Sequence, residues 1–185
     1  MKNKNVTLLV QSSLLLAFAI VFQFVGSKFP GLNQYLVGSV VNAILLTSAY
    51  ICGTFYGIAV GVLTPWTALL VGQLNPAMVP FIPFIMIGNA ILVAVFGLLC
   101  KKSNFGKYIG VLLGSLLKFG FLYLSANKLI HIFGMNLKAE IEKKLIVSMG
   151  IIQLFTALIG GVIALGLIYT LFKRLNITDK ISRSA

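Results

Sequence analysis

Lys118 is the residue of this sequence that is best suited to bind a ligand or take part in chemistry, because it lies inside an apolar stretch. Lys118 lies four residues after Gly114 and continues the series Gly106, Gly110 and Gly114, whose members are also four residues apart. On a helix this spacing places all four residues on one face, and small residues mark the face that packs against other membrane helices. A lysine near mid-membrane costs about 2.5–3.5 kcal/mol or more, so Lys118 is a candidate functional residue. It would attract a carboxylate, a phosphate or a polarised carbonyl group, unless it snorkels or binds helix-end carbonyls.

Several neutral polar residues are expected at a similar depth, in the middle or outer half of the membrane. Hydrogen bonds between helices are an equally good explanation for Asn42, Asn89 and Gln153. Trp66 is either a residue of the interfacial belt or a stacking wall for a ring. We therefore predict a polar pocket that opens outward. Its predicted substrate-binding residues are Asn42, Trp66, Gln73, Asn75, Asn89, Lys118, Ser125 and Gln153.

The rest of the sequence argues against most kinds of chemistry. The three acidic residues, Glu140, Glu142 and Asp179, lie outside every expected span, although ion-coupled carriers usually carry acidic residues inside theirs. No glycine-rich phosphate loop with a lysine occurs, and the single histidine, His131, is too few for a metal site. Nothing resembles a nucleophile with its base. We expect no enzyme, no metal and no cofactor, but a binding protein that takes its energy from a partner.

The composition indicates which kind of secondary structure positions these residues, namely membrane-spanning helices. Of 185 residues, 59% are hydrophobic and 10% charged, whereas soluble domains carry about 25% charged residues. The net charge of +12 comes mostly from residues at helix ends, which favours membrane topology over nucleic-acid binding. We predict an all-α membrane protein with a single six-helix transmembrane domain over residues 1–185. Its spans are Val6–Val25, Leu36–Cys52, Thr54–Gly72, Phe81–Cys100, Lys107–Ile130 and Leu145–Phe172.

The distribution of basic residues predicts the orientation. One side carries Lys2, Lys4, Lys101, Lys102, Lys107, Lys173, Arg174, Lys180 and Arg183, and the other carries Lys28, Lys138, Lys143 and Lys144. Both termini are therefore expected in the cytoplasm, and the first span is expected to be retained. The outer loops, 26–35, 73–80 and 131–144, are candidate lids over the pocket. Residues 136–144 could form a short interfacial helix.

A weak internal repeat relates the second and fourth spans. Val41-Asn42-Ala43-Ile44-Leu45-Leu46 matches Gly88-Asn89-Ala90-Ile91-Leu92-Val93. Both spans run inward, which places the two asparagines at similar depth. Because the composition is biased, the match arises either from duplication or by chance.

The chain resembles the substrate-binding subunits, or S components, of energy-coupling factor (ECF) vitamin transporters. The stretch Gly53–Gly97 carries the resemblance, with its glycine ladder, Thr64-Pro65, Asn75-Pro76 and Pro80-Phe81-Ile82-Pro83 through Asn89. The family also has a small-xxx-small motif in its first helix, which Ser13-Leu14-Leu15-Leu16-Ala17 matches with a serine in place of the first alanine.

That resemblance implies a site near the outer face, between the first loop and helices four to six, with residues 27–35 as a lid. It implies Ser13 and Ala17 as docking positions. It also implies a membrane scaffold (T) subunit and two cytoplasmic ATPase subunits as partners, and import by toppling of this subunit in the bilayer. A signature typical of riboflavin or biotin binders is absent from the sequence.

We therefore expect a subunit of an ABC-type importer in the plasma membrane of a prokaryote. It would bind a vitamin or cofactor precursor. Two alternatives stay open at this point. One is a scaffold that organises other membrane proteins through its glycine faces, and the other is an independent small-molecule carrier.

Overall fold

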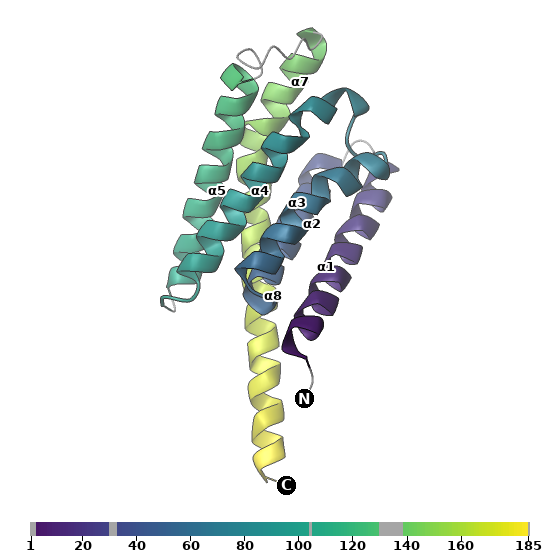
Figure 1. The fold of residues 1–185 in the computed structure, drawn as a ribbon. Helices are drawn as coiled ribbons and strands as arrows, with labels where there is room; N and C mark the ends of the chain where they lie inside the picture. The colour runs from purple at the N-terminus through teal and green to yellow at the C-terminus, as the bar shows by residue number, and fades with distance from the viewer. Residues whose placement is uncertain (1–2, 30–32, 104, 130–138, 185) are drawn as a thin grey trace.

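The computed structural model describes residues 3–29, 33–103, 105–129 and 139–184, and these residues contain helices and no strand. The long helices pack side by side as one bundle, and α7 continues into α8 along the same direction (Figure 1). In chain order they are α1 (Lys4–Ser27), α2 (Asn33–Ile51), α3 (Thr54–Leu70), the 3-10 helix η1 (Pro76–Phe81), α4 (Ile82–Leu99), α5 (Gly106–Leu124), the π-helical turn η2 (Ser125–Leu129), α7 (Ala139–Met149) and α8 (Ile151–Ser184).

Six of these helices form the bundle, as the sequence predicts. Five stretches are long and apolar enough to cross a membrane: Lys4–Ser27, Gln34–Ile51, Pro76–Leu99, Gly106–Lys128 and Leu145–Leu171. The sixth, α3, has 17 residues, and at 1.5 Å per residue it is about 26 Å long. Large apolar side chains such as Phe18, Leu116 and Val162 are exposed on the outside, where lipid can cover them. The chain is a multi-pass membrane protein.

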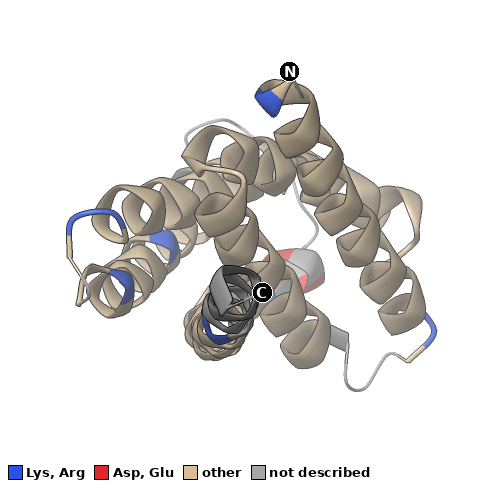
Figure 2. Cartoon of the chain, turned by 90° about the horizontal axis from the view of Figure 1, so that it is seen from below, with Lys and Arg blue, Asp and Glu red and all other residues tan. Residues whose placement is uncertain are grey.

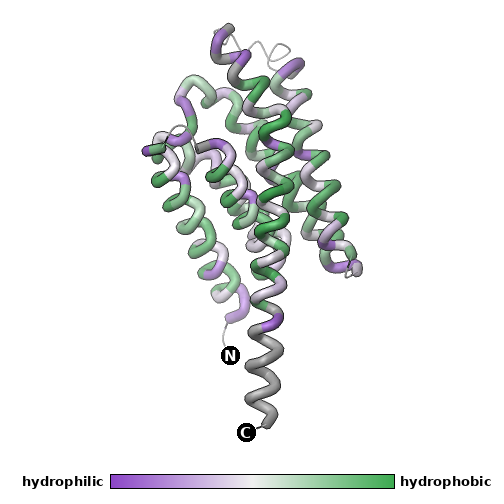
Figure 3. Tube along the Cα trace, turned by 180° about the vertical axis from the view of Figure 1, so that it is seen from behind, coloured by the Kyte–Doolittle hydropathy of each residue, from purple (hydrophilic) through white to green (hydrophobic). Residues whose placement is uncertain are grey.

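Charge and hydropathy vary along the helix axes. Figure 3 shows apolar residues along the length of the helices and hydrophilic residues mainly near their ends. Both termini lie at one end of the bundle (Figure 1), and Figure 2 views this end with its basic residues in blue. Glu140 and Glu142 belong to α7, at the opposite end. The cytoplasmic location of the termini stays a prediction from the distribution of basic residues.

The connection between α2 and α3 is a tight turn. Only Cys52 and Gly53 separate the two helices, and Gly53 has a φ of 99°. L-residues with a side chain rarely adopt this backbone conformation, so the turn requires glycine.

The outer ends of three helices differ from the predicted spans. The fourth begins with η1, which contains Pro80, and Pro83 lies in the first turn of α4, where its missing N–H costs nothing. The fifth ends in a π-helical turn rather than continuing as α-helix. The predicted sixth span, Leu145–Phe172, is divided at Gly150 into the end of α7 and the start of α8.

The half of the bundle nearer the termini is filled by an apolar core. Fully buried side chains from several helices meet there, among them Leu45 of α2, Phe96 of α4 and Ile168 of α8. Glycines in several helices allow neighbouring helices to pack closely. A Cβ added to Gly57 would lie 2.8 Å from the Cα of Ala49, so the backbones of α2 and α3 come together only because glycine has no side chain.

The closest approach of α8 to α2 supplies a test of this packing. A Cβ on Gly160 would lie 2.6 Å from the Ser39 carbonyl oxygen and 2.7 Å from the Cβ of Asn42, whereas a Cβ on Gly166 meets nothing within 4 Å. We expect Gly160→Ala to lower the free energy of unfolding by about 1–3 kcal/mol, because overpacking forces the helices apart. Gly166→Ala, on the same helix, should cause no loss. Thermal unfolding in detergent measures both, and equal stabilities for the two variants would contradict the packing described.

Candidate functional site

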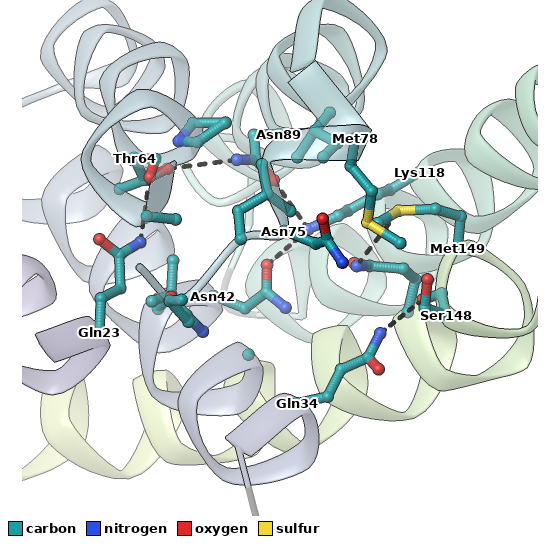
Figure 4. A pocket seen from close by; sticks show the side chains of 18 of the residues that line it. Gln23, Gln34, Asn42, Thr64, Asn75, Met78, Asn89, Lys118, Ser148 and Met149 are labelled. Carbon is teal, nitrogen blue, oxygen red and sulfur yellow. Dashed lines mark hydrogen bonds between the residues drawn. The ribbon is translucent and has the colours of Figure 1, made fainter. Parts of the chain in front are cut away.

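A cavity of about 700 Å³ occupies the half of the bundle away from the termini. Residues from every helix of the bundle contribute to its wall, and Figure 4 shows most of them. Its polar or charged lining residues are Gln23, Gln34, Asn42, Thr64, Gln73, Asn75, Asn89, Lys118, Lys143, Ser148 and Gln153, and the others are Gly38, Val41, Pro65, Ala68, Leu74, Met78, Ile85, Val147 and Met149. The cavity reaches the outer part of α7, where Lys143 and Val147 are exposed.

Lys118 lies at the floor of this cavity and is held by two asparagines. Its side chain is 2% exposed, and its Nζ donates to Asn42 Oδ1 at 2.7 Å and to Asn89 Oδ1 at 2.8 Å. The ammonium therefore neither snorkels nor binds helix-end carbonyls, which were the two alternatives. The asparagines of the sequence repeat do form hydrogen bonds between helices, and they also line the cavity.

A proline in α3 fixes the orientation of Asn89. Pro65 has no N–H, so the Gly61 carbonyl four residues earlier lacks its helical donor. Asn89 Nδ2 donates to this carbonyl oxygen at 2.9 Å, and Thr64 Oγ1 donates to it at 3.0 Å. Because the amide nitrogen is turned towards α3, its oxygen is turned towards Lys118.

The same part of α3 is tied to α1 by Gln23. This side chain is 3% exposed. Its Nε2 donates to the Thr64 carbonyl oxygen at 3.0 Å, and its Oε1 accepts from Thr67 Oγ1 at 2.8 Å. A continuous set of hydrogen bonds thus connects α1 to the floor of the cavity (Figure 4).

The outer wall is built from helix ends and turns. Gly72, which follows the end of α3 and has a φ of 76°, turns the chain so that Gln73 and Asn75 line the cavity. Asn75 Oδ1 caps η1 by accepting from the Ala77 N–H at 2.9 Å. On the other side, Gln34 Nε2 of α2 donates at 3.0 Å to the Ser148 carbonyl oxygen, just before the division between α7 and α8.

The structure brings six of the eight predicted site residues together around one cavity: Asn42, Gln73, Asn75, Asn89, Lys118 and Gln153. Trp66 and Ser125 are not among its lining residues. Trp66 follows Pro65 directly, and one residue turns a helix by about 100°, so its side chain points outward and is 44% exposed. Ser125 is buried at the start of η2, where its Oγ donates to the Phe121 carbonyl oxygen at 2.7 Å.

Sequence reasoning missed several residues that line the cavity. Some of its other predictions concern residues outside the described part of the chain. The missed polar or charged residues are Gln23, Gln34, Thr64, Lys143 and Ser148. Gln23 was detectable as a glutamine near the outer end of an otherwise apolar span. Residues 30–32 of the predicted first lid and residues 130–138, which include His131, lie outside the described residues. The same is true of 136–138 in the predicted interfacial helix, whose remaining residues fall at the start of α7.

The arrangement suits a ligand that brings hydrogen-bond acceptors to the floor. An ammonium has three N–H donors, and the asparagines take two of them. No acidic side chain lines the cavity among the residues described, and this part of the chain holds no cluster of three metal-binding side chains. A buried charge whose partners are neutral is expensive, so a ligand that neutralises it would be stabilised strongly.

Comparison with known proteins adds one match. A family model described as "ECF transporter, substrate-specific component" matches residues 7–172. No curated protein matches the chain significantly, and no solved structure does so either.

The link between Pro65 and Asn89 can be tested with a double-mutant cycle. Asn89→Leu should lower the free energy of unfolding by about 1–3 kcal/mol, since it removes a donor from a buried carbonyl and an acceptor from Lys118. Pro65→Ala restores the backbone N–H, so in that background we expect Asn89→Leu to cost about 0.5–3 kcal/mol less. Pro83→Ala is the control, because Pro83 lies in the first turn of α4 and frees no carbonyl. Additive unfolding free energies for the Pro65 pair would contradict this account.

Proposed function

This chain belongs to the substrate-specific components of ECF transporters, and from this premise we propose that it captures a vitamin or cofactor precursor in the cavity above Lys118. Members of this family are subunits of transporters. The chain is accordingly a membrane-embedded, substrate-specific component. The identity of the bound molecule and its contacts are our proposal.

A single observation carries the proposal, namely the environment of Lys118. Its ammonium is buried at the floor of a cavity of about 700 Å³, a volume typical of small-molecule sites. Its hydrogen-bond partners are neutral amide oxygens. A ligand with an acidic or polar carbonyl group would complete this environment, because the remaining N–H of Lys118 then finds an acceptor.

The proposed site combines this floor with the outer wall. Lys118, Asn42 and Asn89 form the floor, and Gln73, Asn75 and Gln153 contribute amide groups nearer the outer end. Trp66 and Ser125 are left out of the proposed site because they do not line the cavity. Apolar lining residues such as Val41 and Ile85 would contact the body of the molecule.

Delivery requires partners, since nothing in the sequence supplies an ATP site. The family implies a membrane scaffold (T) subunit and ATPase subunits, and we propose two cytoplasmic ATPases, as in the resemblance. Ser13 and Ala17, the proposed docking positions, are both exposed on α1, so a partner helix can reach them. Import would follow toppling of the subunit in the plasma membrane of a prokaryote.

The cavity also argues against the scaffold hypothesis. A protein that only organises others through its glycine faces needs a bundle filled by side chains. Here about 700 Å³ is left open around a buried lysine, and such a cavity reduces stability unless a ligand uses it.

Removing the charge of Lys118 tests the proposed function. We expect Lys118→Met to lower ligand affinity and uptake about 100-fold, because loss of one partner from a buried charged pair costs about 2–5 kcal/mol. Lys128→Met is the matched control, since Lys128 is exposed and does not line the cavity. The assays are mass spectrometry of copurified small molecules, binding to a vitamin panel, and uptake in cells. A wild-type protein that neither copurifies nor binds any small molecule, together with unchanged uptake in Lys118→Met, would refute the proposal.

The docking positions have a separate test. We expect Ser13→Leu combined with Ala17→Leu to reduce uptake at least about tenfold, because bulk on this face blocks close helix approach. Substrate binding by the purified chain should be unchanged, since neither residue lines the cavity. Gly166→Leu adds similar bulk to an exposed position of α8 and should leave uptake intact. Normal uptake by the double variant would rule out this docking face.

A further inference from the structure

We propose that the cavity selects molecules that carry a carboxylate, whose two oxygens are bound by Lys118 and by the side-chain nitrogen of Asn42, while Asn89 is a positioning residue. This inference rests on the proposed function. It narrows the ligand from any acidic or carbonyl group to a carboxylate, and it gives the two asparagines different roles.

Both polar atoms of the Asn89 side chain are already hydrogen-bonded within the protein, so neither is a principal contact for a ligand. Its Oδ1 accepts from Lys118 at 2.8 Å. Its Nδ2 donates to the Gly61 carbonyl oxygen at 2.9 Å and lies 3.3 Å from Thr64 Oγ1. Both ends of the side chain are therefore engaged by protein, and its effect on a ligand acts through the position of Lys118.

Asn42 differs because only one end of its amide is engaged by the described residues. Lysine has only donors, so the oxygen of Asn42 must face it, at 2.7 Å. Figure 4 shows the nitrogen at the opposite side of the amide, turned away from Lys118. Asn42 is 2% exposed and lines the cavity. Its Nδ2 and the third N–H of Lys118 are thus neighbouring donors at the floor.

Two neighbouring donors, one of them cationic, match a carboxylate. Both oxygens of an ionised carboxylate are acceptors, whereas a primary amide presents an NH₂ group that these donors cannot satisfy. A site built in this way rejects an analogue that leaves its buried polar groups unpaired. A phosphate carries more oxygens than a carboxylate, and the two neighbouring donors at the floor would satisfy only two of them.

The first experiment needs no variant and uses the full-length wild-type protein. Molecules released by organic extraction are analysed by mass spectrometry before and after carbodiimide coupling to aniline, which labels carboxyl groups. We expect the released molecule to gain one aniline adduct per carboxyl group. In parallel, thermal shifts are measured with acid and amide pairs: nicotinate and nicotinamide, biotin and biotinamide, lipoate and lipoamide, pantothenate and pantothenamide. Any pair that binds should favour the acid at least about tenfold.

These measurements separate the two proposals. A released molecule without a carboxyl group, or a probe pair that favours the amide, would overturn the carboxylate inference and leave the proposed function standing. A phosphorylated molecule without a carboxyl group would have the same effect. Release of nothing and no shift from any probe, together with unchanged uptake in Lys118→Met, would overturn both proposals.

The second experiment tests the role of Asn42. Asn42→Asp keeps an acceptor for Lys118 but replaces the free donor by an oxygen, so we expect copurified acid to fall about 100-fold. Any probe pair that binds should shift its preference towards the amide. Asn127→Asp is the matched control and should change neither, because Asn127 does not line the cavity and its Nδ2 donates to the Tyr123 carbonyl oxygen. An Asn42→Asp protein that elutes as a folded species and retains the acid would overturn the assignment of Asn42.

Discussion

The structure depends on one buried cation that is held by neutral partners. Lys118 lies within the apolar interior of a membrane bundle, where two amide oxygens from α2 and α4 replace water. Such an arrangement orients the ammonium without neutralising it. The protein therefore places the Lys118 amine at the floor of a cavity, and a ligand that brings a negative charge there would stabilise its ammonium form.

Holding that charge in place requires the surrounding helices to fit closely. Gly160 lets α8 approach the backbone of α2 beside Asn42, and Pro65 frees the carbonyl that fixes Asn89. Below them, the apolar core fills the half of the bundle nearer the termini. The floor of the cavity thus depends on two local features. The absence of a side chain at Gly160 allows the position of Asn42, and the absence of an N–H at Pro65 sets the orientation of Asn89.

The same contacts connect the cavity with the helix that we propose as the docking surface. Gln23 of α1 bonds to Thr64 of α3, whose hydroxyl shares the Gly61 carbonyl with Asn89. A shift of α1 would therefore alter hydrogen bonds that lead to Lys118.

The sequence alone determined the membrane class, the number of spans and the candidate status of Lys118, because hydropathy and the four-residue glycine spacing report directly on burial and helix face. The repeat also placed Asn42 and Asn89 at one depth. Only the tertiary structure decided that both asparagines bind the lysine, that Gln23 joins them, and that Trp66 points outward. Those facts depend on the rotation of each helix about its axis and on the carbonyl freed by Pro65, which hydropathy does not encode.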